Sequence, residues 1–265
     1  ALIRKCVGAG HHKGDNGDFW DMTAITLGMV FCNTGKVGIK EGRLEWPVTE
    51  EERNSEKGWG CLQQGQICRL KVRRLLDELV PEHTTPKQFN SWAVIEVLEP
   101  SVSCPQLEAV WEEYQKPVHI EDEVLGTLKL NRDFGLLDGE ILWNGEEVSL
   151  ALEIDLDDEE TWDTARSIAH KVMADRESWD KSMREFAAKE LTELANEWQA
   201  DDDEKENADP ITEEAFAQRI TLSELSLTYE GDFTAYFDDD DMFWGHTVEV
   251  CGSLENGIES ANIAG

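Results

Sequence analysis

The chain has 265 residues and a formal net charge of −33, with 57 acidic residues against 24 lysines and arginines. Residues 1–120 hold 17 acidic and 14 basic residues, and residues 121–265 hold the other 40 and 10. Such a field repels phosphate backbones, which disfavours nucleic-acid binding by the C-terminal half, and it attracts basic proteins or cations. No apolar run approaches the roughly 20 residues that cross a bilayer, and no signal peptide opens the chain, so we expect a cytoplasmic protein without membrane contact.

Residues 1–100 are predicted to form a mostly-β domain. Apolar residues alternate from Ile25 to Phe31, residues 36–46 have the pattern of a hairpin, and residues 66–73 and 92–97 have that of two further strands. Several short strands separated by glycine-containing turns indicate a small barrel or a sandwich.

Residues 101–120 are predicted to be a short helical linker. A helix from Pro105 to Tyr114 breaks before Pro117, and the step in charge falls at the same place. The sequence therefore predicts a domain at 1–100, a linker at 101–120 and an acidic α+β domain at 121–265.

The acidic domain is predicted to be an antiparallel sheet with two longer helices packed on one face. Asn144-Gly145 lies between two alternating segments and predicts a two-residue type I′ turn. A helix is expected from Asp157–Asp158 onward, and a second from Ser178 to Trp198 carries an apolar stripe. The remaining expected elements are a helix over 213–219, capped by its preceding threonine, and strands over 225–229, 233–237, 247–251 and 258–263.

The densest candidate site follows the strand that ends at Phe237. Its binding candidates are Asp238, Asp239, Asp240, Asp241, Trp244 and His246. Clustered carboxylates suit Ca²⁺ or Mg²⁺, but the spacing of an EF-hand fails in either possible alignment. Three interpretations stay open: a hairpin turn that buries its aromatics, a partner-binding edge, and a divalent-cation site with Asp238, Asp240 and His246 as ligands. No other cofactor is expected.

Two weaker candidates lie in the first domain. His11 and His12 precede Asp15 and Asp18, a set that could ligate Zn²⁺, but adjacent side chains on an extended chain point opposite ways. We therefore interpret this segment as a glycine-rich surface loop. The glycines near it have the spacing of neither a Walker A loop nor a dinucleotide fingerprint.

A basic stripe of Arg69, Lys71 and Arg73 lies on one face of the strand predicted over residues 66–73. It could contact RNA, dock on the acidic domain, or simply face solvent. The cysteines are scattered and form no C-x-x-C pair, which is typical of buried, reduced thiols; they are Cys6, Cys32, Cys61, Cys68, Cys104 and Cys251.

The C-terminal half resembles a bacterial domain-of-unknown-function family, number 2262, over about residues 120–265. The residues that carry the resemblance are Gly126–Leu130, Trp143-Asn144-Gly145, the tryptophan-bearing helix pair, Ile211-Thr212 with Ala215-Phe216, Tyr236–Asp238, Phe243–His246 and Ala264-Gly265. The first half resembles the barrel-like domain that often precedes this family. The resemblance implies a bacterial, cytosolic protein and transfers no activity and no catalytic residue.

Three functional hypotheses follow. The leading one is a non-catalytic, immunity-like binding protein that uses its acidic surface against a basic protein. The alternative is a metal-dependent hydrolase built on Asp238–Asp241 and His246. A third is a nucleic-acid adaptor that works through the basic stripe. No convergent catalytic set is visible, so the sequence favours the absence of enzymatic activity without deciding it, and the oligomeric state stays open.

Overall fold

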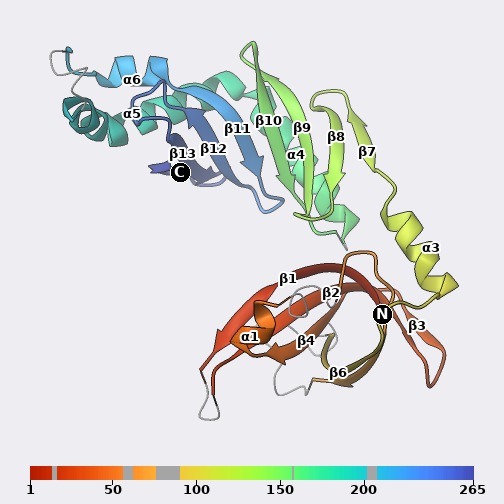
Figure 1. Cartoon of the computed structure of the whole chain (residues 1–265). Helices are drawn as coiled ribbons and strands as arrows, with labels where there is room; N and C mark the ends of the chain where they lie inside the picture. Colours follow the sequence, from red (N-terminus) through yellow and green to blue (C-terminus); the bar gives the residue numbers. More distant parts are fainter. Residues whose placement is uncertain (14–16, 56–61, 76–89, 157, 202–207) are drawn as a thin grey trace. The chain divides into compact units, whose positions relative to one another are not determined.

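The computed structural model describes residues 1–13, 17–55, 62–75, 90–156, 158–201 and 208–265. The chain divides into two compact units, Ala1–Lys116 and Pro117–Gly265 (Figure 1). Among the residues described, no helix has the length and apolar character needed to cross a membrane. The predictions for Asp15, Cys61, Asp157 and most of the acidic loop at 201–206 fall outside the described residues.

The first unit is built on one sheet with the strand order β1-β2-β4-β6-β5, and β3 pairs with β2 off this path. Its strands are β1 (Leu2–His12), β2 (Phe19–Phe31), β3 (Lys36–Gly38), β4 (Gly42–Val48), β5 (Arg69–Arg74) and β6 (Ser91–Glu99). The predicted barrel is wrong in one respect, because the described strands do not close. A single isolated bridge, Leu2 to Ile67, joins β1 to the segment before β5.

The hydrophobic core of this unit is small, and its residues follow the predicted alternation along the strands. Ala24 and Leu44 are fully buried, and Leu70 and Val72 of β5 pack against the same cluster. A helix forms from Pro105 to Tyr114 (α3), with the predicted bounds, and its Leu107 is buried. This helix belongs to the first unit. The four-residue α1 (Glu50–Arg53), which was not predicted, begins with a capping box.

The second unit contains an eight-stranded sheet in the order β14-β13-β12-β11-β10-β9-β8-β7. Its strands are β7 (His119–Asp122), β8 (Gly126–Asn131), β9 (Leu136–Trp143), β10 (Glu146–Glu153), β11 (Thr221–Leu227), β12 (Asp232–Asp238), β13 (Thr247–Ser253) and β14 (Gly257–Ala264). The predicted α+β class fits, but the purely antiparallel sheet is wrong. Strands β10 and β11 pair in parallel, with Leu150 opposite Leu225, because the helices between them form a crossover.

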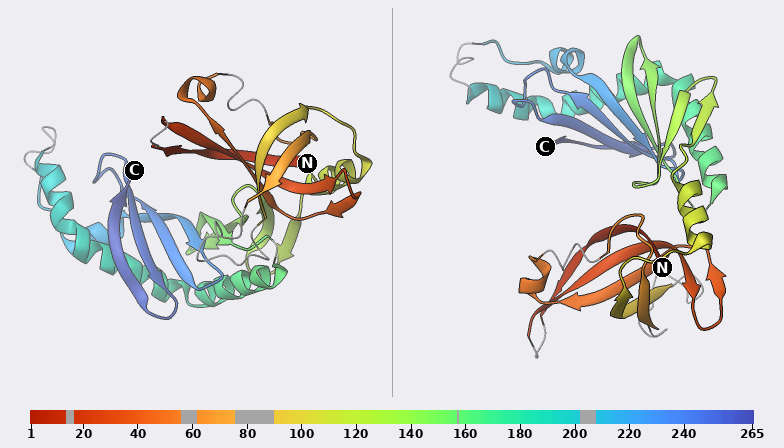
Figure 2. Two further views of the ribbon diagram at one scale, coloured as in Figure 1. Left: turned by 90° about the horizontal axis from the view of Figure 1, so that it is seen from below. Right: turned by 45° about the vertical axis from the view of Figure 1, so that its right-hand side comes forward.

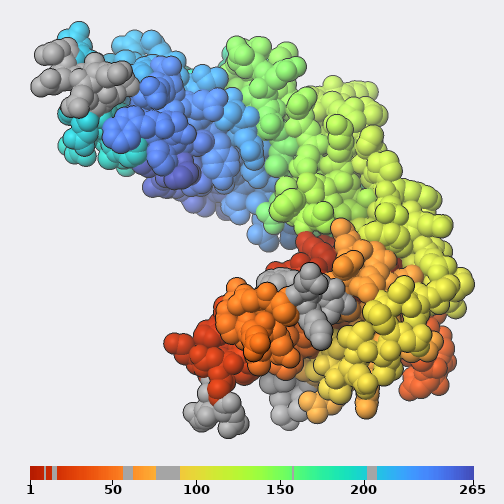
Figure 3. Space-filling model, viewed as in Figure 1, coloured from red at the N-terminus to blue at the C-terminus, as the bar shows by residue number. Residues whose placement is uncertain are grey.

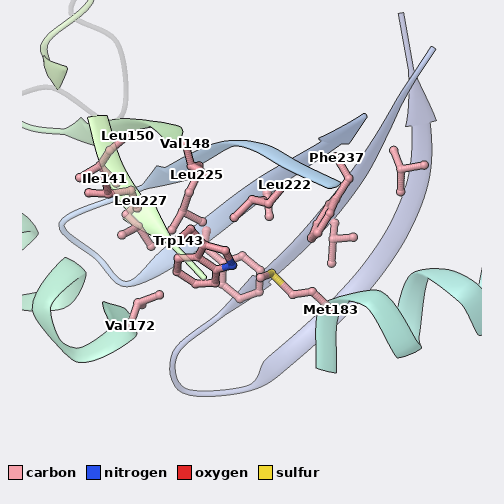
Figure 4. Packing of buried hydrophobic residues seen from close by; sticks show 14 of the residues in the cluster. Ile141, Trp143, Val148, Leu150, Val172, Met183, Leu222, Leu225, Leu227 and Phe237 are labelled. Atoms are coloured by element: carbon pink, nitrogen blue, oxygen red, sulfur yellow. The ribbon is translucent and has the colours of Figure 1, made fainter. Parts of the chain in front are cut away.

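The crossover contains α4 (Glu159–Ala174), α5 (Arg176–Ala200) and α6 (Glu213–Arg219). The two long helices run along one face of the sheet (Figure 2). Their buried side chains meet those of the strands in one core, where Val172 and Met183 lie near Trp143 (Figure 4). The Trp143 indole N–H, inside this core, donates to the Asp180 carboxylate at 2.9 Å.

The predicted hairpin at Asn144-Gly145 forms as expected. Both residues have positive φ, 50° and 102°, and Trp143 lies opposite Glu146 in the register of β9 and β10. Asparagine and glycine tolerate this left-handed backbone better than other residues, so the turn fixes which side chains of each strand face the helices.

Candidate functional site

The acidic segment after β12 is a compact double turn. Positive φ angles occur at Asp240 and Asp241, and again at Trp244 and Gly245. Each pair is closed by a backbone hydrogen bond of 3.1 Å, one from the residue after Asp241 and one from the residue after Gly245. Two central residues with positive φ are the signature of type I′ turns, which explains why aspartate and glycine occupy these positions.

The aspartates of this turn have different roles. Asp239 is 5% exposed, and its carboxylate accepts from the N–H groups of Asp241 at 3.1 Å and Phe243 at 2.5 Å. Asp240 is exposed, and its carboxylate accepts from Arg219 Nε of α6 at 2.7 Å. Asp238 is exposed on the other side of the turn, at the end of β12. Two of the four carboxylates are therefore engaged in holding the turn itself.

The aromatics of the turn are split between core and surface. Phe243 is fully buried, whereas Trp244 is 56% exposed. Trp198 of α5 contacts both, and it also meets the half-buried His246 edge-on at 5.5 Å between ring centroids. The structure thus supports the hairpin-turn interpretation for Phe243, while Trp244 and His246 form a small aromatic surface against α5.

The cation interpretation finds no ligand set. Within the described ranges, no group of three or more His, Cys, Asp or Glu side chains could hold a metal ion. Asp238, Asp240 and His246 are therefore not brought together. The alternative of a metal-dependent hydrolase stays a prediction.

The two adjacent histidines lie at the end of strand β1 and not in the predicted loop. Their side chains diverge, as expected for an extended chain. His11 Nε2 lies 3.5 Å from an Asp18 oxygen, and His12 Nε2 lies 3.2 Å from an Asp21 oxygen. Each imidazole therefore faces its own carboxylate, and the described members of the possible zinc set, which are His11, His12 and Asp18, do not form a metal site.

The basic stripe forms on β5 as predicted, with Arg69, Lys71 and Arg73 exposed and the residues between them half-buried. Arg69 makes an ion pair with Glu99 of the neighbouring strand β6. Binding of nucleic acid to this stripe stays a prediction. Of the five cysteines in the described ranges, Cys68 alone is buried and Cys32 is exposed, so burial of the thiols was overestimated.

The second unit has a polar sheet face opposite α4 and α5, here called the open face. One row of neighbours crosses five strands, from Glu140 through Ser149, Glu224 and Tyr236 to Glu249. Neighbouring strands lie about 4.8 Å apart, so the three carboxylates recur about every 10 Å with a hydroxyl between each pair.

Acidic residues outnumber basic ones on the strands of this unit. Counted over both faces of the sheet, the eight strands contain twelve acidic residues and one lysine or arginine, Lys129. The bases of the unit lie mainly on the helices, where several pair with acids, such as Arg184 with Asp180 at 2.8 Å. The helix side is thus partly neutralised, and the sheet side is not.

Tyr236 lies at the centre of this acidic row. Burial raises the pKa of its phenol, and the neighbouring Glu249 and Glu224 raise it further. Burial also raises the pKa of the Cys251 thiol in the adjacent row. Both groups therefore stay protonated at neutral pH, so Tyr236 is a hydrogen-bond donor between two carboxylates and Cys251 is a poor nucleophile.

A hollow of about 580 Å³ lies on the open face across β8 to β11. Its polar lining includes Lys129, Asp138, Glu140, Ser149 and Glu224. This site was not predicted from the sequence. Period-two alternation assigns these residues to polar strand faces, but only the strand order, which is a tertiary property, shows that they are neighbours.

A second feature missed from the sequence joins β7 to α4. The Asp122 side chain is 4% exposed, and it accepts from the N–H groups of Val124 and Leu125 and from His170 Nε2 at 2.8 Å. Arg166 lies 3.6 Å away. Burial alone would raise the pKa of Asp122, but these hydrogen bonds outweigh it and place the pKa below its ordinary value.

Asp122→Asn is expected to lower the free energy of unfolding by about 1.5–3 kcal/mol at neutral pH, since the hydrogen bonds of an ionised group are lost. A carboxyl with a depressed folded pKa contributes stability above its unfolded value, about 3.8, and loses it as pH falls through the folded pKa. The difference between wild type and variant should therefore shrink below that pH. Urea unfolding from pH 7 to pH 3 measures it; a difference that does not change with pH would contradict the assignment.

Architecture and site define a protein of two compact units, each built on one β-sheet. Residues 122–263 match the family described as "Uncharacterized protein conserved in bacteria (DUF2262)", and residues 1–114 match "Domain of unknown function (DUF7021)". Because the first match covers more than half of the chain, the chain belongs to the DUF2262 family, which confirms the predicted resemblance. No curated protein and no solved structure matches the chain.

Proposed function

We propose that this protein is a non-catalytic binding protein whose second unit holds a basic protein on its open sheet face. The row of Glu140, Glu224 and Glu249, spaced by the strand register, carries the proposal. Its carboxylates match lysines or arginines that recur about every 10 Å on a partner. Tyr236 offers an aromatic anchor in the middle of the row.

The distribution of charge favours this reading over a general effect on solubility. Acidic residues outnumber lysines and arginines on the strands that form the open face, where Lys129 is the one base of this kind. This excess of negative charge speeds the encounter with a cationic surface and makes it sensitive to salt. The immunity-like role, in which the basic partner would be a toxin, remains one version of this proposal.

Glu140→Lys combined with Glu224→Lys is expected to weaken capture of the partner by about tenfold or more, because it places two cations in the row. Tagged full-length protein would be incubated with lysate of the source bacterium at low and high salt, and bound proteins quantified by mass spectrometry. Wild type should retain a specific basic protein at low salt and lose most of it at high salt.

The matched control is Glu190→Lys combined with Glu193→Lys, which makes the same change in net charge on exposed positions of α5. This control should capture the same protein as wild type. Equal loss in both double variants would mean that only net charge matters, and it would overturn the open face as the site. Circular dichroism of each variant verifies that the fold is retained.

A further inference from the structure

Among the described residues of the first unit, the sheet does not close between β1 and β5. The segment before β5 pairs with the beginning of β1: Ile3 N–H donates to Gln66 O, and Cys68 N–H donates to Ala1 O, both at 2.9 Å. The pairing goes no further, and β5 ends the strand order of the sheet. From Arg69 onward, no described strand pairs with the outer edge of β5.

The backbone groups of this edge can be assigned from the alternation of antiparallel pairing. Cys68 directs its N–H toward β1, so Leu70 and Val72 direct theirs to the same side. At the two register irregularities between β5 and β6, the extra residues belong to β6. The backbone of β5 therefore keeps its regular alternation. An unpaired edge of this kind is a template for a further strand.

A hollow of about 660 Å³ lies along this edge. Consecutive residues of three segments line it, 29–33 at the end of β2, 67–72 at β5 and 102–104 before α3, and Leu44, Trp92 and Leu107 contribute apolar surface. These segments are coloured red-orange, orange and yellow in Figure 3. Its volume is in the range of sites that enclose a ligand, and its lining of consecutive strand residues suits an extended backbone.

We propose that the hollow binds an extended acidic peptide, which pairs antiparallel with β5 and continues the wall of the sheet. This is a mode of recognition in which main-chain hydrogen bonds give affinity and alternate side chains give specificity. Peptide residues opposite Leu70 and Val72 point inward and are apolar. Residues opposite Lys71 and Arg73 point outward with these cations and are acidic. The basic stripe then acts as the recognition surface.

The probe is a fluorescein-labelled six-residue peptide of alternating glutamate and valine, titrated with the full-length protein and followed by fluorescence anisotropy. Binding is expected, and it should weaken at least about tenfold in Lys71→Glu/Arg73→Glu. Lys13→Glu/Lys40→Glu makes the same charge change at exposed positions outside the lining and should bind like wild type. A peptide with lysine in place of glutamate should not bind. Absence of binding by the glutamate peptide overturns the proposal.

Two further measurements locate the peptide. Hydrogen exchange at Leu70 and Val72 should slow on binding, because both N–H groups gain a partner; unchanged exchange there would contradict strand addition. The same peptide fused ahead of Ala1 would continue the Ala1–Cys68 pairing along the same edge, so the fused protein should no longer bind the free peptide. Binding that persists in the fused protein would place the peptide elsewhere and overturn the proposal.

Discussion

Phe243→Ala is expected to lower the free energy of unfolding of the second unit by about 3–5 kcal/mol. The Phe243 ring is fully buried and lies edge-on against Trp198 and Phe216, with centroid distances of 5.6 and 6.1 Å. Its removal leaves a cavity between α5, α6 and the double turn. Hydrogen exchange along a urea series, read on peptides of the second unit, measures the loss separately from unfolding of the first unit.

Trp244→Ala is the natural control, because the two aromatics are adjacent in the chain and the tryptophan is larger. Its ring is 56% exposed and contacts Trp198 at 4.8 Å, so its removal should cost about 1 kcal/mol or less. If the two substitutions destabilise equally, the division of this segment into a buried and an exposed aromatic is wrong.

Local signals in the sequence determined the short-range structure well. The helix over 213–219 formed with the predicted bounds because Thr212 accepts a hydrogen bond from the Ala215 N–H at 3.1 Å, as its position before two acids indicated. The Asn144-Gly145 hairpin formed for the same kind of reason. In both cases the deciding atoms lie within a few residues of each other in the chain.

Such local signals could not predict which strands pair when the strands lie far apart in the chain. Ser149 and Glu224 are neighbours in the sheet, yet three helices separate them in the chain. Alternation in β10 and β11 shows that each has a polar face, but the pattern is the same whatever strand lies beside it. The acidic row from Glu140 to Glu249 could therefore not be predicted. The predicted site was instead the turn in which four acidic residues are adjacent in the sequence. The opening in the first sheet was missed for the same reason, since closure depends on contacts between β1 and β5.

The four aspartates of the turn show most clearly what the sequence pattern cannot predict, because four identical adjacent residues give no sign of which one is buried. Asp239→Ala is expected to destabilise the second unit by about 1–3 kcal/mol, since the buried Phe243 N–H loses its acceptor. Asp238→Ala, one residue earlier and exposed, should change the free energy of unfolding by less than about 0.5 kcal/mol. The same urea series with hydrogen exchange compares the two variants, and the amides of Asp241 and Phe243 should exchange faster only in Asp239→Ala.

Asp239→Asn refines the test. The amide of asparagine keeps one acceptor oxygen where the carboxylate has two, so it can retain one of the two backbone hydrogen bonds. Its loss of stability should fall between those of Asp239→Ala and wild type, with only one of the two amides exchanging faster. A loss in Asp238→Ala as large as that in Asp239→Ala would show that the cluster acts through its total charge.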